Sequence, residues 1–482
     1  MKKMASLKKN ILYQGSYQAF MLVIPLIISP YVTRVLGGDA LGEYTFTNTN
    51  AYYFVLVAML GIARHGQRAI AAVRDDETQL RRVFWSLEFV HACASLIALL
   101  SYVIFIFVFS DAQYRVLYVI QVLYVLSALF DVTWFFYGLE DFKSVILRNF
   151  IIKVSELLGV FLCIKGPDDI GKYALIVSAS VLCGQLVMLP QMMKRVPPIR
   201  FEKKDVFQHL KPLFTLALSV IAVALYTVFD KTLLGMMTKE KKNVAFYEYA
   251  DKLVRVPISL IAAIGTVTYP RMCHLLSENK EDKAAKNIFD QSIALTAFLA
   301  FGAITLFLGG GEEFGRLYYG QEFEVSGSVM LAMSPIILFI TVGDIFRTQI
   351  LIPRKKDSVF VLIICINAIV NLLLSIYFIP MLGIYGAVLG TCVAEFLGFA
   401  LCLIFSRKYI PISSLLSELA PFLIIAGLGV LAAYGMKWLP KMQNAWLSFG
   451  FRICAQGLLY VGLCMVWLWN KKREMIKLLF RS

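Results

Sequence analysis

Apolar runs long enough to cross a lipid bilayer recur from one end of this 482-residue chain to the other, separated only by short polar joints. A helix needs roughly 20 residues to span the hydrocarbon core. Because no water is available there to bond an open backbone, each run has to form a helix. Hydrophobic residues make up 59% of the chain and charged residues only 16%. The sequence therefore predicts an all-α integral membrane protein with no room for a soluble domain.

The apolar runs predict about fourteen transmembrane helices. Their expected ranges are 11–33, 43–72, 82–109, 114–138, 145–164, 171–192, 210–236, 245–270, 288–309, 327–352, 357–379, 383–406, 417–438 and 446–470. The start of the chain resembles a secretory signal, but Gln14, Tyr17 and Gln18 interrupt its apolar run and no small-residue cleavage site follows. We therefore expect this segment to be kept as the first helix.

The net charge of +15 comes from basic residues that gather in alternate joints. Those joints are 1–9, 73–82, 194–211, 271–286, 354–356, 407–408 and 471–482. The intervening joints hold far fewer basic residues, and 311–324 is acidic. This alternation follows the positive-inside rule, so it predicts that both termini lie in the cytoplasm and argues against nucleic acid as a partner.

The cysteine and histidine patterns carry no metal or redox signal. The nine cysteines are scattered without CxxC spacing, and the four histidines have no ligand spacing. There is also no GxxxxGK[ST] motif for a nucleotide. We expect no cofactor and no metal, and any driving energy has to come from the membrane potential, an ion gradient or consumption of the product.

Short sequence echoes suggest two similar halves. "GIARHGQR" (61–68) pairs with "GTVTYPRM" (265–272), Asp131 with Asp344, and "GKYALIV" (171–177) with "GIYGAVL" (383–389). The offset is about 210 residues, which leaves about six helices in each half and predicts parallel lobes facing a cleft. We expect an N-terminal lobe at 1–193, a cytoplasmic linker at 194–211, a C-terminal lobe at 212–408, and appended helices 13–14 with a basic tail at 409–482.

Ionisable residues inside the apolar runs are candidates for function, because such residues usually face a bundle interior or an aqueous cavity. Some have a local partner three residues away and are equally explained as pairs that satisfy each other: Glu88 with His91, Lys153 with Glu156, and Asp344 with Arg347. Arginines near the expected cytoplasmic face, such as Arg64, are equally explained by snorkelling to the headgroups. Glu395 has no partner three or four residues away on its own helix, which favours a protonated carboxyl or an ion site.

The stretch "YEYADKLVRVP" (247–257) opens a predicted helix with four charges. Lys252 and Arg255 share one helix face, and so do Glu248, Asp251 and Arg255. A cationic face of this kind suits a phosphate or diphosphate, whose oxygens accept several charge-assisted hydrogen bonds. The alternative is a cluster of charges that anchors the helix end at the membrane interface.

Three stretches resemble the polysaccharide-transporter, or oligosaccharide repeat-unit flippase, family. They are "YVTRVLGGDALGEYTFTNTNAYYF" (31–54), "YEYADKLVRVPISLIAAIGTVTYPRM" (247–272) and "YGAVLGTCVAE" (385–395). The family belongs to the superfamily of multidrug and toxin extruders and lipid II flippases. The resemblance covers essentially the whole chain and implies two six-helix lobes in a V, as in the extruders, with an extra helix pair.

The resemblance also implies a substrate and a site. The substrate would be a polyprenyl-diphosphate-linked oligosaccharide, carried across the bacterial cytoplasmic membrane for capsule, O-antigen or other surface polysaccharide synthesis. Lys252 matches the family's basic cavity position well, whereas Arg34 and Arg64 match only loosely. Where the lipid II relatives carry arginine in the first helix, this chain has Gln14, Tyr17 and Gln18, which favours contacts to sugars over contacts to phosphate.

We therefore expect Lys252, Arg255, Arg64, Arg34 and Lys153 to contact the diphosphate, and Glu395, Asp131 and Asp251 to be candidates for ion coupling. Expected partners are membrane lipids and the glycosyltransferases and polymerase of the same pathway. One alternative is a cation-coupled multidrug extruder, which would favour acidic and aromatic walls. Another is a membrane-embedded polysaccharide polymerase, an enzyme, for which the outer joints are too short.

Overall fold

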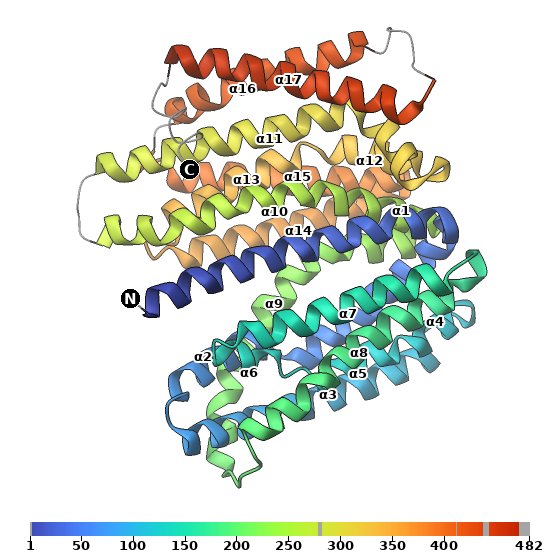
Figure 1. Cartoon of the computed structure of the whole chain (residues 1–482), viewed down its shortest axis with the longest axis vertical. Helices are drawn as coiled ribbons and strands as arrows, with labels where there is room; N and C mark the ends of the chain where they lie inside the picture. The colour runs from blue at the N-terminus through green and yellow to red at the C-terminus, as the bar shows by residue number, and fades with distance from the viewer. Residues whose placement is uncertain (1, 278–281, 411, 437–442, 472–482) are drawn as a thin grey trace. The chain divides into compact units, whose positions relative to one another are not determined.

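The chain folds into helices throughout the part that its computed structural model describes, residues 2–277, 282–410, 412–436 and 443–471 (Figure 1). Side chains are described from residue 23 onward, apart from a few short stretches. Within these residues, ten helices are long and apolar enough to cross a membrane, or up to eleven if the bent pair Gln321–Met333 and Ile336–Leu351 is one span. The prediction of an all-α membrane protein is confirmed, and fourteen remains the predicted number of spans.

The chain divides into two compact units. The first contains residues 1–235 and 239–245, and the second contains 236–238 and 246–482. The linker expected at 194–211 therefore lies inside the first unit, and the helix that follows it packs with that unit as well. The division into two six-helix lobes after residue 193 stays a prediction based on the sequence echoes.

The first unit contains the helices up to α9. They are α1 (Lys2–Met59), α2 (Ile62–Val73), α3 (Glu77–Val108), η1 (Ala112–Tyr114), α4 (Arg115–Ile120), α5 (Val122–Leu129), α6 (Thr133–Gly138), α7 (Phe142–Cys163), η2 (Pro167–Asp169), α8 (Ile170–Arg195) and α9 (Lys203–Met237).

Of three backbone breaks in this unit, the first lies in the joint expected between 33 and 43, and the other two depart from the predicted helix ranges. Gly37, at φ 78° and ψ 173°, separates α1 into two helical segments. The helix expected at 43–72 is interrupted at Leu60 and Gly61, which both have positive φ, so α2 is separate. The helix expected at 114–138 is divided into α4, α5 and α6. Hydrophobicity predicts that a segment lies in the membrane, but it carries no information about such local backbone breaks.

The core of the first unit is rich in aromatic residues. The ring of Trp134 on α6 stacks on Phe84 of α3 with centroids 5.3 Å apart, and Phe135 packs edge-on against Phe84. Gly66 on α2 makes room for Trp134, because a Cβ at this position would lie 2.4 Å from the indole ring. α2, α3 and α6 are thereby joined around one buried cluster.

The second unit contains the helices from α10 onward. They are α10 (Lys242–Ser277), α11 (Asp282–Tyr319), η3 (Gln321–Phe323), α12 (Glu324–Met333), α13 (Ile336–Phe346), the π-helix η4 (Arg347–Leu351), α14 (Asp357–Leu382), α15 (Ile384–Ser406), α16 (Ile412–Met436) and α17 (Ala445–Lys471). α10 is shared, since its first four residues belong to the first unit.

Small residues let α14 and α15 pack closely. A Cβ at Gly390 would lie 2.6 Å from the Ser375 hydroxyl, and one at Gly398 would lie 2.1 Å from the Asn367 amide. Close helix contact through small residues is typical of membrane proteins, where the lipid provides little hydrophobic drive for helix association. This contact brings polar side chains of α14 beside those of α15.

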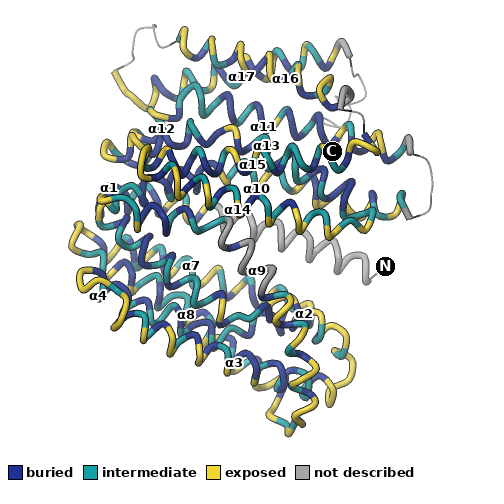
Figure 2. The backbone as a smooth tube through the Cα atoms, turned by 180° about the vertical axis from the view of Figure 1, so that it is seen from behind, coloured by how far each residue is buried: buried dark blue, intermediate teal, exposed yellow. Residues whose placement is uncertain are grey.

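The outer faces of the helices are apolar, as a lipid surround requires. Leu96, Ile97, Leu100, Ile104 and Phe107 recur at helical spacing on α3, and all five are exposed (Figure 2). In a water-soluble protein such a continuous apolar stripe would be an interaction surface. Here it is explained by contact with lipid tails.

Candidate functional site

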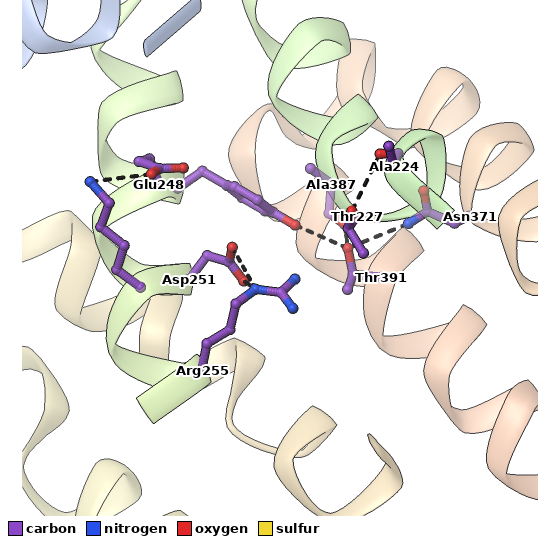
Figure 3. A network of polar contacts seen from close by, with 10 residues as sticks. Ala224, Thr227, Glu248, Asp251, Arg255, Asn371, Ala387 and Thr391 are labelled. Atoms are coloured by element: carbon purple, nitrogen blue, oxygen red, sulfur yellow. Dashed lines mark hydrogen bonds and ion pairs between the residues drawn. The ribbon is translucent and has the colours of Figure 1, made fainter. Parts of the chain in front are cut away.

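The first turns of the membrane-spanning part of α10 carry two ion pairs (Figure 3). The Lys252 ammonium lies 3.2 Å from a Glu248 carboxylate oxygen. The Arg255 Nε lies 2.8 and 2.9 Å from the two carboxylate oxygens of Asp251. Both pairs have i, i+4 spacing, with the acid on the N-terminal side, which is the favourable orientation on a helix.

The two carboxylates lie deeper than the two cations. Glu248 and Asp251 keep 16% and 6% of their side-chain surface exposed, whereas Lys252 and Arg255 keep 38% and 44%. The sequence predicted a cationic face, and the structure adds that each cation already has an acidic partner on its own helix. The segment therefore pairs two partly exposed cations with two carboxylates that are more deeply buried.

Lys252 also lies against an aromatic wall. Its ammonium is 4.4 Å from the centroid of the Tyr249 ring. Tyr249 is buried, its carbonyl accepts a hydrogen bond from the Tyr319 hydroxyl at 3.0 Å, and its ring packs edge-on against Phe323. Tyr249 is thus fixed from two sides, so the Lys252 head group has a rigid surface on which to rest.

A hydroxyl and amide network joins α10 to α14 and α15. The Tyr247 hydroxyl lies 3.1 Å from the Thr391 hydroxyl, and the Asn371 amide donates to the same oxygen at 3.4 Å. The Thr391 hydroxyl in turn donates to the Ala387 carbonyl of its own helix at 3.1 Å (Figure 3). Three helices of the second unit therefore converge at Thr391.

Glu395 lies one helical turn after Thr391 on α15. It is partly exposed and interacts electrostatically with Arg255. Arg255 is therefore influenced by two carboxylates, Asp251 on its own helix and Glu395 on another. This arrangement brings together four of the predicted site residues, Asp251, Lys252, Arg255 and Glu395.

The other predicted site residues belong to the first unit. Arg34 on α1 and Arg64 on α2 are exposed, and the Lys153 ammonium lies 2.7 Å from Glu156 on α7. Asp131 lies at the break before α6, where its carboxylate accepts from the Thr133 backbone N–H at 2.8 Å. Gln14, Tyr17 and Gln18 lie outside the residues whose side chains the structure describes.

The structure shows a local contact for each of the pairs expected at i, i+3 spacing. Besides Lys153 with Glu156, His91 lies 3.5 Å from Glu88, and Arg347 contacts Asp344. The carboxylates of Glu88, Glu156 and Asp344 thus each have a partner on their own helix. In the described part of the chain, no three His, Cys, Asp or Glu side chains lie close enough to hold a metal ion.

Sequence reasoning missed several polar contacts between helices. Asn371 and Thr391 were not singled out, although Asn367 and Asn371 form an i, i+4 pair of amides in an uncharged run that could have drawn notice. Buried Gln349 donates to the Thr268 and Ser292 hydroxyls at 2.7 and 2.8 Å. Buried His65 and His209 lie 3.0 Å apart, joining α2 to α9.

Comparison with known proteins places this arrangement in a family. The family model described as polysaccharide biosynthesis protein matches residues 7–276, more than half of the chain. A protein of Shigella dysenteriae, provisionally named an O-antigen transporter, is 25% identical over 79% of this chain and 94% of its own length. A protein of Escherichia coli (strain K12), with the same provisional name, is 22% identical over 84% of this chain and 97% of its own length.

Solved structures show the same fold. "Lipid II flippase MurJ, inward closed conformation" superposes with a TM-score of 0.77 at 16% identity, covering 96% of this chain and all of that one. An inward-facing multidrug resistance transporter of the MATE family, within the MOP superfamily, gives 0.62 at 12% identity, covering 83% of this chain and 95% of that one. At these identities the likeness establishes the fold.

Proposed function

The chain belongs to the polysaccharide biosynthesis protein family, and on that premise we propose that it is a flippase for polyprenyl-diphosphate-linked oligosaccharides. It acts as a transporter and catalyses no covalent step. It moves its substrate across the bacterial cytoplasmic membrane, with both termini on the cytoplasmic side. The names of the two relatives support a surface polysaccharide as the end product.

One observation carries the proposal: two partly exposed cations, Lys252 and Arg255, pair with more deeply buried carboxylates on one helix. A diphosphate has more oxygens and more charge than either carboxylate. It can therefore bind both cations through charge-assisted hydrogen bonds while their ion pairs loosen. When the diphosphate leaves, Glu248 and Asp251 form their ion pairs with Lys252 and Arg255 again. The empty site then carries no net charge from these four residues.

The paired state also favours release of the substrate. A site that is strongly cationic when empty would hold a diphosphate tightly and slow its departure. Because the internal carboxylates compete for the same cations, the affinity is moderated. Glu395, near Arg255, and Asp251 are the groups of this unit that we propose to couple an ion to this exchange.

Other parts of the proposal rest on the sequence. Gln14, Tyr17 and Gln18 are proposed to contact the sugars, and Arg34, Arg64 and Lys153 are proposed as further diphosphate contacts. Asp131 is proposed as a second ion-coupling group. The glycosyltransferases that make the substrate and the polymerase that consumes it are the proposed pathway partners.

The test is delivery of lipid-linked oligosaccharide to the outer leaflet by full-length protein in cells that lack their own flippase. The double variant Glu248→Gln/Lys252→Gln removes one pair without stranding a buried charge, and Asp251→Asn/Arg255→Gln does the same for the other. We expect both to lose delivery, whereas Lys252→Arg keeps it. The exchange Glu248→Lys/Lys252→Glu keeps an ion pair but moves its cation about 6 Å along the helix, so it should also lose delivery.

A matched control is the pair Glu313→Gln/Arg452→Gln, which removes an ion pair between α11 and α17 and should leave delivery intact. Amounts of inserted, folded protein are equalised for all variants. If both α10 double variants deliver oligosaccharide as well as the wild type does, the four charged residues only anchor the helix end at the membrane interface. Export of organic cations by the wild type, with no delivery of oligosaccharide, would instead favour a multidrug extruder.

A further inference from the structure

A second cationic site lies at the other end of α10, in a cavity of about 220 Å³. Its wall is built from four segments of the second unit: the end of α10, the start of α11, the stretch from η4 to residue 354, and the joint 408–410 between α15 and α16. Met272 of this cavity lies seventeen residues after Arg255, which corresponds to about 25 Å along the helix axis. The cavity is therefore separate from the candidate flippase site.

Three cations line the cavity. They are Lys286 near the start of α11, Arg354 in the turn after η4, and Lys408 in the joint between α15 and α16. All three lie in or beside joints that the positive-inside rule assigns to the cytoplasm, namely 271–286, 354–356 and 407–408. No carboxylate is among the described residues that line the cavity, so every charged side chain in that lining is positive.

The Tyr409 ring contacts basic side chains at the cavity. The Arg354 guanidinium carbon lies 4.3 Å from the centroid of the Tyr409 ring, and the Lys356 ammonium lies 5.3 Å from the same centroid. Arg354 also donates to the Ile350 carbonyl at 3.3 Å. Stacking on an aromatic ring and a backbone contact restrict the guanidinium, so less conformational entropy is lost when it binds an anion.

The remainder of the lining is apolar. Met272, Ala285, Phe289 and Ile350 contribute to it and are all buried. Met272 and Ala285 continue into a hydrophobic cluster with Ile288, and the Phe289 ring packs edge-on against Phe346. An apolar lining beside three cations suits a ligand with both a phosphate and a hydrocarbon part.

We propose that this cavity binds the phosphate headgroup of an anionic phospholipid of the cytoplasmic leaflet. Lys and Arg donate charge-assisted hydrogen bonds to phosphate oxygens. Basic pockets between membrane helices on the cytoplasmic side recognise anionic headgroups for this reason, and the anionic lipids are concentrated in that leaflet. The bound lipid links the ends of α10, α11, η4 and α15.

The test is lipid binding by purified full-length protein, measured by native mass spectrometry during titration with dioleoylphosphatidylglycerol. The triple variant Lys286→Gln/Arg354→Gln/Lys408→Gln should bind one lipid fewer per protein, and Arg354→Gln alone should weaken that lipid by about fivefold. Dioleoylphosphatidylcholine, which has no net charge, should show no difference between wild type and variants. The charge-keeping variant Lys286→Arg/Lys408→Arg should bind as the wild type does.

A control of equal charge change is Lys194→Gln/Lys203→Gln/Lys211→Gln in the first unit, which should leave phosphatidylglycerol binding unchanged. Equal binding by the wild type and the cavity triple variant, with both proteins folded, would overturn the proposal. Loss of binding in the charge-keeping variant would do the same, because packing and not charge would then be responsible. Since no transport is measured, failure here leaves the flippase proposal standing.

A separate arm uses inorganic phosphate alone and follows the thermal unfolding temperature. We expect millimolar phosphate to have the same effect on the wild type and on the triple variant. Stabilisation of the wild type only, together with unchanged phosphatidylglycerol binding, would assign the cavity to a soluble phosphate and reject the lipid.

Discussion

The hydroxyls of Tyr247 and Thr391 lie 3.1 Å apart and connect α10 to α15 inside the second unit. Thr391 also receives the Asn371 amide of α14. The contact fixes α10 at the residue directly before Glu248, where its two ion pairs begin. One oxygen atom, the Thr391 hydroxyl, thus takes part in the contacts of the candidate site's helix with both α14 and α15.

Replacing Thr391 should cost more stability than replacing Tyr247. Tyr247→Phe removes one hydrogen bond and should lower the free energy of unfolding by about 1 kcal/mol, whereas Thr391→Val takes the shared oxygen from both Tyr247 and Asn371 and should cost about 1–3 kcal/mol. Unfolding of the two variants in detergent provides the comparison. An equal loss in both would mean that Asn371 does not depend on Thr391.

Gly42 should tolerate no side chain. A Cβ there would lie 2.1 Å from the Lys241 carbonyl oxygen, a backbone atom, so Gly42→Ala should lower the free energy of unfolding by about 1–3 kcal/mol or prevent folding. Gly427→Ala is the matched control, because nothing lies within 4 Å of its added methyl group. In the interior of α16 this change should raise helix stability by about 0.5–1 kcal/mol. The measurement is the folded yield and the unfolding temperature of both variants compared with the wild type.

Asp141, in the joint between α6 and α7, should make the folding stability depend on pH at low pH. Partial burial acts to raise the pKa of this carboxyl, but hydrogen bonds from Ser144 and the Arg195 guanidinium at 2.6 Å outweigh it, so the pKa lies below its ordinary 3.8. The folded state therefore favours the ionised form. The stability that results is complete above pH 3.8 and is lost as the pH falls through the lowered pKa.

The corresponding measurement is the unfolding temperature of wild type and Asp141→Asn between pH 7 and pH 3. We expect the variant to be less stable at pH 7 and to lose less on acidification. Arg195→Met should reduce the acid dependence in the same direction. Parallel curves for wild type and Asp141→Asn would contradict the assignment.

Removing the hydrogen bonds that α3 donates to segment 196–198 should let this segment open more often. Arg81 Nε donates to the Pro197 carbonyl at 3.0 Å, and the Trp85 indole donates to the Val196 carbonyl at 3.1 Å. In Arg81→Ala/Trp85→Phe we expect trypsin to cleave after Arg200 several times faster, because local opening has become easier. Arg74→Ala, which loses only its ion pair with Glu140, should be cleaved at the wild-type rate.

The topology can be tested with single cysteines in a cysteine-free background. Glu322→Cys lies in the joint after α11, and Glu202→Cys lies in the joint before α9. From the alternation of basic joints we expect a membrane-impermeant maleimide to label the first variant in intact cells and the second only after permeabilisation. The reverse pattern would invert the orientation and move the basic cavity to the outside.

The sequence predicted membrane segments better than it predicted how they are interrupted or joined. Runs of apolar residues indicate helices because the bilayer leaves no alternative for the backbone. The break at Gly37 falls in the joint predicted between 33 and 43, whereas the break at Leu60 and Gly61 depends on backbone angles, which leave no trace in hydrophobicity. Gly37 lies in "VLGGDALG" (35–42), where three glycines are candidates and spacing alone selects none of them.

The sequence predicted which residues form the candidate site, but not which of their side chains contact each other. Asp251 and Arg255 were recognised as neighbours on one helix face, yet whether their side chains turn toward each other depends on rotamers and surrounding packing. For Glu395, the search for a partner on its own helix was bound to fail, because the charge near it, Arg255, belongs to α10. Contacts between distant segments, such as Tyr247 with Thr391, carry no local signal at all.

The π-helix η4 has one more residue in its turn than an α-helix would have, and its wide turn is closed by the Ile352 N–H, which donates to the Arg347 carbonyl at 3.0 Å. The residues after it are consequently set back by about 100° around the axis relative to a regular continuation of α13. Arg354 contacts Tyr409 in this shifted register. A chain shortened by one residue within 347–351 would keep its hydrophobic profile almost unchanged, yet it would turn Arg354 away from the cavity. The number of residues in 347–351, and not only their composition, thus determines where the Arg354 guanidinium lies.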